Sequence, residues 1–141
     1  RVAPCFYYRM PTDREPVFFS ERYQTAGIVR NNPADVVLHG VGRADDMTQR
    51  RQLPGPVSAE VLRKGAVAEA YGCYFDRRGR LVYSASTVAH NLGALKPDCA
   101  MIAVAAGAKK AEAIAAVMKS RRHAMLVTDE GAAKAILGET P

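Results

Sequence analysis

Residues 101–119 constrain the fold of this chain more than any other stretch. They begin with an uninterrupted apolar run, Met-Ile-Ala-Val-Ala, which predicts a strand buried on both faces. After a turn of small residues at Ala106 and Gly107, apolar residues recur at the spacing of a helix that packs one face on a core. A buried strand that leads directly into an amphipathic helix is typical of a parallel sheet with helical crossovers.

Two lysines, Lys109 and Lys110, lie in the first turn of this predicted helix. Positive charge at a helix N-terminus opposes the helix dipole, which favours anions there. The conflict disappears if an anionic ligand sits at the N-terminus, because backbone N–H groups and a lysine side chain then converge on one phosphate. The alternative is that both lysines are solvated, at a cost of a few tenths of a kcal/mol.

Strands and helices alternate along most of the chain, whose 141 residues are typical of one domain. The predicted elements are strands at residues 2–8, 35–41, 99–105 and 124–128, helices at residues 21–31, 58–64, 108–119 and 129–137, and a helical turn or loop at residues 45–51. Residues 70–75 and 80–83 flank a glycine-containing turn, which is typical of a β-hairpin. We therefore predict an α/β fold with a mostly parallel sheet, helices packed on its faces and an inserted β-hairpin.

Charge and cysteine content limit the classes of partner and compartment. Twenty Lys and Arg against fourteen Asp and Glu give a net charge of +6, which suits either nucleic acid or phosphorylated metabolites. Cys5, Cys73 and Cys99 lack metal-ligand spacing, and we expect them to be reduced in a cytoplasm. The sequence has no bilayer-length apolar run and no signal-peptide pattern. Because it starts at Arg1 rather than at a methionine, we expect a fragment of a longer protein.

Polar groups are expected to gather where the predicted strands end, because ligands bind beyond the carboxyl ends of parallel strands. The candidate segments are residues 40–42 leading to residues 49–51, residues 106–110 and residues 128–130, with Glu69 as a further candidate. Arginine and lysine beside the glycine turns at Gly40, Gly42 and Gly107 suit a phosphate, and a carboxylate accepts hydrogen bonds from sugar hydroxyls. This combination predicts a phosphosugar site, whereas a nucleic-acid groove would need aromatic side chains interleaved with basic ones.

Other candidate groups are weaker. His39 lies inside an apolar strand, where a hydrogen-bonded core histidine is more common than a ligand, and His90 and His123 have no Cys or His at metal-ligand spacing. Asp129 could form an acid–base pair with Glu130, but we favour a helix N-cap. We therefore predict no catalytic residue, no metal ion and no cofactor.

Four strings of this sequence, in this order, resemble one protein family. They are GVGRADDMTQRR, GAVAEAYGCYFDRRGRLVY, IAVAAGAKKAEAI and LVTDEGAAKAIL. Over about residues 36–137 the chain resembles the effector-binding domain of SorC-type bacterial transcriptional regulators. That resemblance implies a Rossmann-like domain, related to sugar-phosphate isomerase folds. Such a domain binds a phosphorylated sugar, such as fructose 1,6-bisphosphate, and controls a separate DNA-binding helix-turn-helix.

The resemblance also implies roles for individual residues. Arg50 in TQRR matches a phosphate-contacting arginine, and Glu69 in AVAEAYG matches an acidic residue that holds sugar hydroxyls. Lys110 in AAGAKKAEAI, rather than Lys109, matches the phosphate-contacting lysine. The sequence departs from the family at Ala106, where the first glycine of a Gly-Gly pair is usual.

The same resemblance implies that residues 1–141 are the C-terminal part of the effector-binding domain, without the DNA-binding helices and the first half of the sugar domain. We expect a homo-oligomer, a dimer or a tetramer, that represses carbohydrate genes, contacts DNA only through the absent domain and does not contact a membrane. Residues 70–83, including Tyr74, are a candidate subunit contact. The alternatives are a sugar-phosphate isomerase or deaminase of the related fold, and an oligomerisation module.

Overall fold

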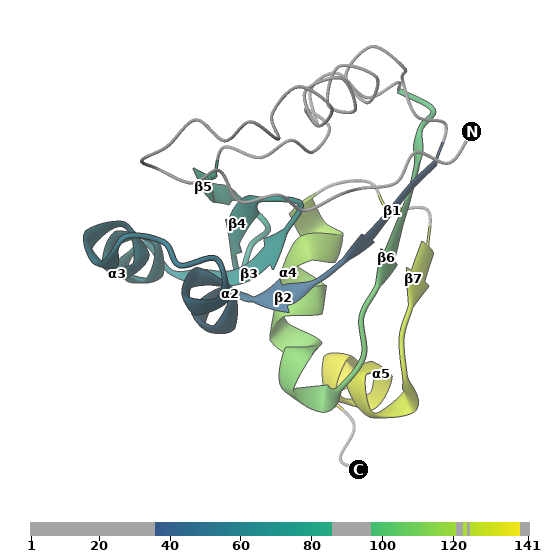
Figure 1. Cartoon of the computed structure of the whole chain (residues 1–141). Coiled ribbons are helices and arrows are strands. Elements are labelled where there is room, and N and C mark those ends of the chain that lie inside the picture. Colours follow the sequence, from purple (N-terminus) through teal and green to yellow (C-terminus); the bar gives the residue numbers. More distant parts are fainter. Residues whose placement is uncertain (1–35, 86–96, 121–122, 124, 139–141) are drawn as a thin grey trace.

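The computed structural model describes residues 36–85, 97–120, 123 and 125–138 (Figure 1). The strand predicted at residues 2–8, the helix predicted at residues 21–31, Cys5 and His90 lie outside these described residues. In chain order the elements are β1 (Val36–Gly40), β2 (Gly42–Arg43), α2 (Ala44–Arg50), α3 (Gly55–Arg63), β3 (Ala66–Ala70), β4 (Cys73–Asp76), β5 (Leu81–Ser84), β6 (Ala100–Val104), the 3-10 helix η2 (Ala108–Lys110), α4 (Ala111–Ser120), β7 (Met125–Val127) and α5 (Glu130–Leu137). Within the described ranges, every helix is too short or too polar to cross a membrane.

The strands form two sheets. Strands β1, β6 and β7 pair in parallel in the order β1-β6-β7, and strands β2 to β5 pair antiparallel in the order β2-β3-β4-β5. The α/β fold with a parallel sheet is therefore confirmed. The predicted hairpin is larger than expected, because β2 and β3 pair alongside it and make a separate sheet.

A tight turn at Tyr71 and Gly72 divides the strand that was predicted at residues 70–75. Both residues have positive φ, 46° at Tyr71 and 86° at Gly72, and the flanking Ala70 and Cys73 pair across the turn. Two central residues with positive φ are the geometry of a two-residue hairpin. The prediction of one continuous strand here is wrong because the apolar run conceals this turn.

The parallel sheet buries one face more deeply than the other. On the inner face, Met101 is 3% exposed and Ala103 is fully buried, and the helices α4 and α5 contribute to the same core. On the opposite face, cross-strand neighbours line up as Leu38–Ile102–Met125 and as Gly40–Val104–Val127. Leu38, Val104, Met125 and Val127 are between 42% and 54% exposed there. The prediction of burial on both faces is therefore wrong at Val104.

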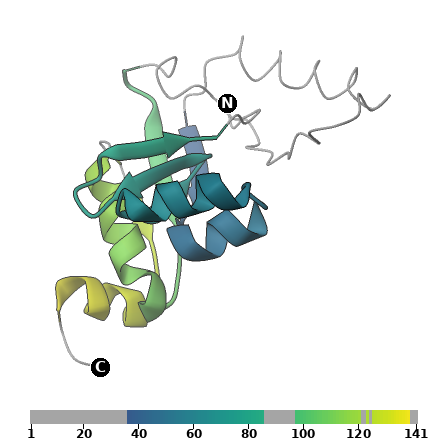
Figure 2. The same ribbon diagram turned by 90° about the vertical axis from the view of Figure 1, so that its left-hand side faces the viewer.

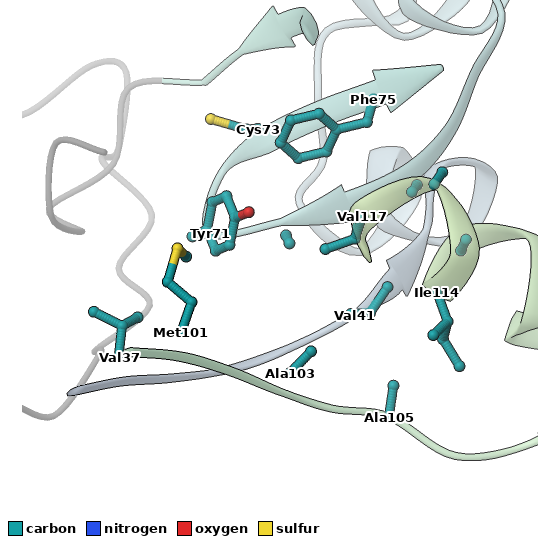
Figure 3. Packing of buried hydrophobic residues seen from close by; sticks show 14 of the residues in the cluster. Val37, Val41, Tyr71, Cys73, Phe75, Met101, Ala103, Ala105, Ile114 and Val117 are labelled. Carbon is teal, nitrogen blue, oxygen red and sulfur yellow. The ribbon is translucent and has the colours of Figure 1, made fainter. Parts of the chain in front are cut away.

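The main core joins the two sheets through α4 (Figure 3). Ile114 and Val117 of α4 are fully buried, and they pack in one cluster with Met101 of β6 and Phe75 of β4. Ile114 belongs to the apolar spacing predicted from the sequence, whereas Val117 does not. This packing places η2, at the start of α4, beside the carboxyl end of β6.

A second core lies on the other face of the antiparallel sheet, where α2 and α3 cover β3 (Figure 2). Tyr74 is fully buried in this core, and its ring packs against that of Tyr83 with the centroids 5.8 Å apart. Tyr74 is therefore not available for the predicted subunit contact, because its side chain is buried within the chain, and a contact through other residues of the hairpin at residues 70–83 stays a prediction.

The structure tests the helix starts that the sequence predicts at residues 58 and 129. The helix α3 begins at Gly55, and the Ser58 N–H donates to the carbonyl of Pro54 (2.9 Å). The predicted start at residue 58, with Ser58 as the N-cap, is wrong because Pro56 fits the first helical turn, where no N–H is needed. The predicted cap at Asp129 is confirmed, since its carboxylate accepts the Ala132 N–H at 2.8 Å.

The turn between β4 and β5 lies directly on the C-terminal end of α4. A Cβ at Gly79, whose φ is 77°, would come within 2.6 Å of the Ser120 nitrogen and 2.9 Å of the Ala116 oxygen. Arg77 beside this turn forms an ion pair with Glu112 of α4. The turn is therefore seated on α4, the helix that begins next to Lys110.

Candidate functional site

A pocket of about 480 Å³ opens at the carboxyl end of β1. It is lined by Leu38, His39, Gly40, Val41, Gly42, Met47, Arg50, Arg51, Glu69, Tyr71 and Lys110. These residues come from β1, β2, α2, β3, the β3–β4 turn and η2. Its volume falls in the range of about 300–1,000 Å³ that is typical of small-molecule sites.

The structure brings together five of the six residues predicted to bind an effector. Gly40, Gly42, Arg50, Glu69 and Lys110 all line this pocket. The sixth, Gly107, is not among the lining residues, and its N–H donates to the Asp129 carboxylate at 2.9 Å. Asp129 therefore connects the start of α5 to the turn before η2, a contact that sequence analysis did not anticipate.

Arg50 and Lys110 bring positive charge to the pocket. Arg50 ends α2 and is exposed, and Lys110 ends η2 and is half-buried. Neither forms an ion pair with any residue that the structure describes, whereas Arg43, Arg51, Arg63, Arg77 and Arg80 each do. An anion that enters the pocket would therefore meet two cationic side chains without first displacing a carboxylate.

The two lysines of the predicted helix N-terminus differ in position. Lys110 lines the pocket and Lys109 does not. Both lie in the 3-10 helix that precedes α4, and the Lys110 N–H donates to the Gly107 carbonyl at 2.9 Å. The Lys110 N–H is therefore already engaged within the turn, and Lys110 brings its side-chain charge to the pocket.

Gly42 allows the chain to pass close to α2. A Cβ at this position would collide with the side chain of Met47. Gly42 also pairs with Glu69 in the antiparallel sheet. The chain therefore passes at Gly42 from the parallel sheet into the antiparallel sheet. The glycine turn predicted at residues 40–42 thus connects the two sheets and lines the pocket.

Glu69 forms a buried ion pair with Arg51, which lies in the candidate segment at residues 49–51 but was not predicted to bind the effector. Arg51 Nη2 lies 2.8 Å from Glu69 Oε1, and the two side chains are 11% and 3% exposed. The same oxygen accepts the Gly72 N–H at 2.7 Å. Burial raises the pKa of the Glu69 carboxyl, while the Arg51 guanidinium and the Gly72 N–H act in the opposite direction. The sequence signal for a role of Arg51 was its place beside Arg50 at a predicted helix end.

His39 meets a second histidine at the wall of the pocket. Its Nδ1 donates to the Gly40 carbonyl at 3.1 Å, so its Nε2 accepts the N–H of His123 Nε2, also at 3.1 Å. His39 is 6% exposed, which confirms the prediction of a hydrogen-bonded core histidine, and burial lowers its pKa. Within the described part of the chain, no three His, Cys, Asp or Glu side chains gather closely enough to hold a metal ion.

Comparisons with known proteins agree on one kind of domain. A family model described as "Putative sugar-binding domain" matches residues 15–138. The chain is 42% identical over 104 residues to the Central glycolytic genes regulator of Priestia megaterium. The matched region covers 74% of this chain and 30% of that protein. It is 30% identical over 145 residues to the Erythritol catabolism regulatory protein EryD of Brucella abortus, with 98% and 45% covered.

A solved structure supports the same grouping. A SorC family transcriptional regulator from Enterococcus faecalis superimposes with a TM-score of 0.74 at 34% identity, covering 84% of this chain and 47% of that one. This chain therefore spans less than half the length of each of these three proteins.

Proposed function

This chain belongs to the family of sugar-binding domains of SorC-type transcriptional regulators, and we propose that its pocket binds a phosphorylated sugar as an effector. One observation carries the proposal: Arg50 and Lys110 reach the same pocket from two different elements, and neither has an ion-pair partner among the described residues. Arginine offers a planar fork to a phosphate, and lysine offers a compact charge. Together they favour a phosphate group over a neutral sugar.

The sugar part of the ligand would lie toward Glu69. A carboxylate accepts hydrogen bonds from hydroxyl groups, and Glu69 is the acidic residue in the lining. Two of the relatives are named for the regulation of glycolytic genes and of erythritol catabolism. By analogy we propose a glycolytic phosphosugar, with fructose 1,6-bisphosphate as the first candidate.

The chain belongs to a family whose relatives are regulators, which supports a sensor rather than a sugar-phosphate isomerase or deaminase. The geometry agrees, because Glu69 would be the general base of such an enzyme. Its carboxylate is instead held by Arg51 and by the Gly72 N–H.

A ligand that bridges α2 and η2 would act by stabilising one arrangement of the domain. It shifts the equilibrium only by its difference in affinity between two arrangements. Because η2 leads into α4, and α4 carries the turn at Gly79, a shift at Lys110 would reach the antiparallel sheet. We propose that, in a full-length cytoplasmic repressor, this shift changes the arrangement of subunits in a homo-oligomer and thereby controls the DNA-binding domain.

Thermal unfolding of the full-length protein tests the proposal. Fructose 1,6-bisphosphate at a hundred times its dissociation constant adds about 2.7 kcal/mol to the free energy of unfolding and raises Tm. Fructose should give no shift at the same concentration. Arg50→Ala should abolish the shift, whereas Arg78→Ala, which removes another exposed arginine without a described ion pair, should keep it. No shift with any phosphosugar in the unmodified protein would refute the proposal.

A further inference from the structure

We infer that Arg51 is a positioning residue that holds the Glu69 carboxylate in place for the hydroxyl groups of the ligand, while Arg50 and Lys110 bind its phosphate. This inference rests on the proposed function, since it assigns the neighbouring arginines Arg50 and Arg51 to two different tasks at the proposed site.

The end of α2 separates the two arginines. Arg50 is the last helical residue, and Arg51 is the C-cap, whose N–H donates to the Met47 carbonyl at 3.0 Å. Successive helical side chains point about 100° apart, so adjacent residues face different surroundings. Arg50 is exposed at the pocket, whereas the Arg51 side chain is 11% exposed and turns toward β3.

The environment of Glu69 is unfavourable to a charge without Arg51. Glu69 is paired across the sheet with Gly42 on β2 and with Tyr74 on β4, and Tyr74 is fully buried. A carboxylate removed from water in this way tends to take up a proton unless a positive charge compensates it. Arg51, 2.8 Å away, supplies that charge, and the Gly72 N–H orients the same oxygen.

The consequence for recognition is selectivity between ligands that carry phosphate. Inorganic phosphate needs only the two cations, Arg50 and Lys110. A sugar phosphate also needs an ionised and oriented carboxylate that accepts its hydroxyl groups. Arg51 would therefore affect the affinity for the sugar phosphate and leave the affinity for inorganic phosphate unchanged.

The test measures the affinity of the full-length protein for fructose 1,6-bisphosphate and for inorganic phosphate, and follows the ratio of the two from pH 6 to pH 8. Arg51→Met should keep the inorganic phosphate affinity within about twofold and lower the sugar phosphate affinity about tenfold, as expected for one lost charge-assisted hydrogen bond. The loss should deepen as the pH falls, because Glu69 becomes protonated. Arg50→Met, the matched control, should weaken both ligands.

Glu69→Gln identifies the route by which Arg51 acts. This variant should lower the same ratio at every pH, and Arg51→Met added to it should lower the ratio no further. Because removal of one partner of a buried ion pair can prevent folding, Arg51→Lys provides the second comparison. It keeps the charge, so its ratio should lie between those of the unmodified protein and Glu69→Gln, with the same pH profile as the unmodified protein.

Three results would overturn the inference. Equal losses of both ligands in the Arg51 variants would make Arg51 a direct phosphate ligand. An unchanged ratio in Arg51→Lys and Arg51→Met would make the pair purely structural. Additive losses in the double variant would mean that Arg51 acts independently of Glu69. If the unmodified protein binds neither ligand, the proposed function itself has failed, which is a different outcome from these three.

Discussion

The seating of the β4–β5 turn on α4 predicts that Gly79→Ala is much more destabilising than an ordinary glycine substitution. Gly79 has a φ of 77°, and a methyl group there would meet the backbone of α4 at 2.6–2.9 Å. Alanine at positive φ costs about 1 kcal/mol once its smaller unfolded-state entropy is included. Forcing apart packed backbone adds about 1–3 kcal/mol. We therefore expect the free energy of unfolding to fall by about 2–4 kcal/mol.

Gly65→Ala is the matched control for this substitution. Gly65 has a φ of 82°, but a Cβ there has no heavy atom within 4 Å. Its cost should therefore be the backbone term alone, about 1 kcal/mol. Both variants are measured by urea unfolding monitored by circular dichroism. Equal losses of stability in the two variants would refute the docking of this turn on the end of α4.

Three further predictions concern the core, the α5 cap and the ligand. Ile114→Ala, at a fully buried site between the two sheets, should lower the free energy of unfolding by about 2–5 kcal/mol, and a loss as small as that of the less buried Ile102→Ala would contradict the assigned core. The Ala132 and Gly107 N–H groups hold the pKa of Asp129 below its ordinary value of 3.8, so its stabilising effect is complete above that pH and is lost as the pH falls through the lowered pKa. Asp129→Asn should flatten this acid limb in thermal unfolding, and an unchanged limb would count against the double hydrogen bond. A phosphate ester loses its second proton near pH 6, so affinity for a sugar monophosphate should rise from about pH 5 to pH 7 in titration calorimetry, and a falling affinity would argue against binding of the dianion by Arg50 and Lys110.

The sequence was sufficient for those parts of the fold that depend on local periodicity. The apolar run at residues 101–105 and the spacing of Ile114 in the helix after it required no knowledge of the tertiary structure. Which face of that strand is covered depends on elements elsewhere in the chain, and so the exposure of Val104 was not predictable. The turn at Tyr71 was hidden for another reason, since its neighbours are all suited to a strand.

The candidate site was likewise predictable where it depends on local sequence and not where it depends on long-range contacts. Arg50 and Lys110 were placed by their positions after predicted strands and by the family resemblance, and both line the pocket. The separate role of Arg51, within the candidate segment at residues 49–51, was not predictable because a one-residue step at a helix end decides which arginine enters the interior. The contact between His39 and His123 spans 84 positions and could not be inferred from spacing. Long-range pairs of this kind require the tertiary structure.

The central claim is that Arg50 and Lys110 bind the phosphate of the ligand, and the neighbouring lysines offer the most direct test. Titration calorimetry of the full-length protein with fructose 1,6-bisphosphate would compare Lys110→Ala with Lys109→Ala, which removes the same charge one residue away and outside the pocket. The account predicts a loss of at least about tenfold in affinity for Lys110→Ala, the size of one charge-assisted hydrogen bond, and unchanged binding for Lys109→Ala. Equal affinities in the two variants, or a larger loss in Lys109→Ala, would contradict it.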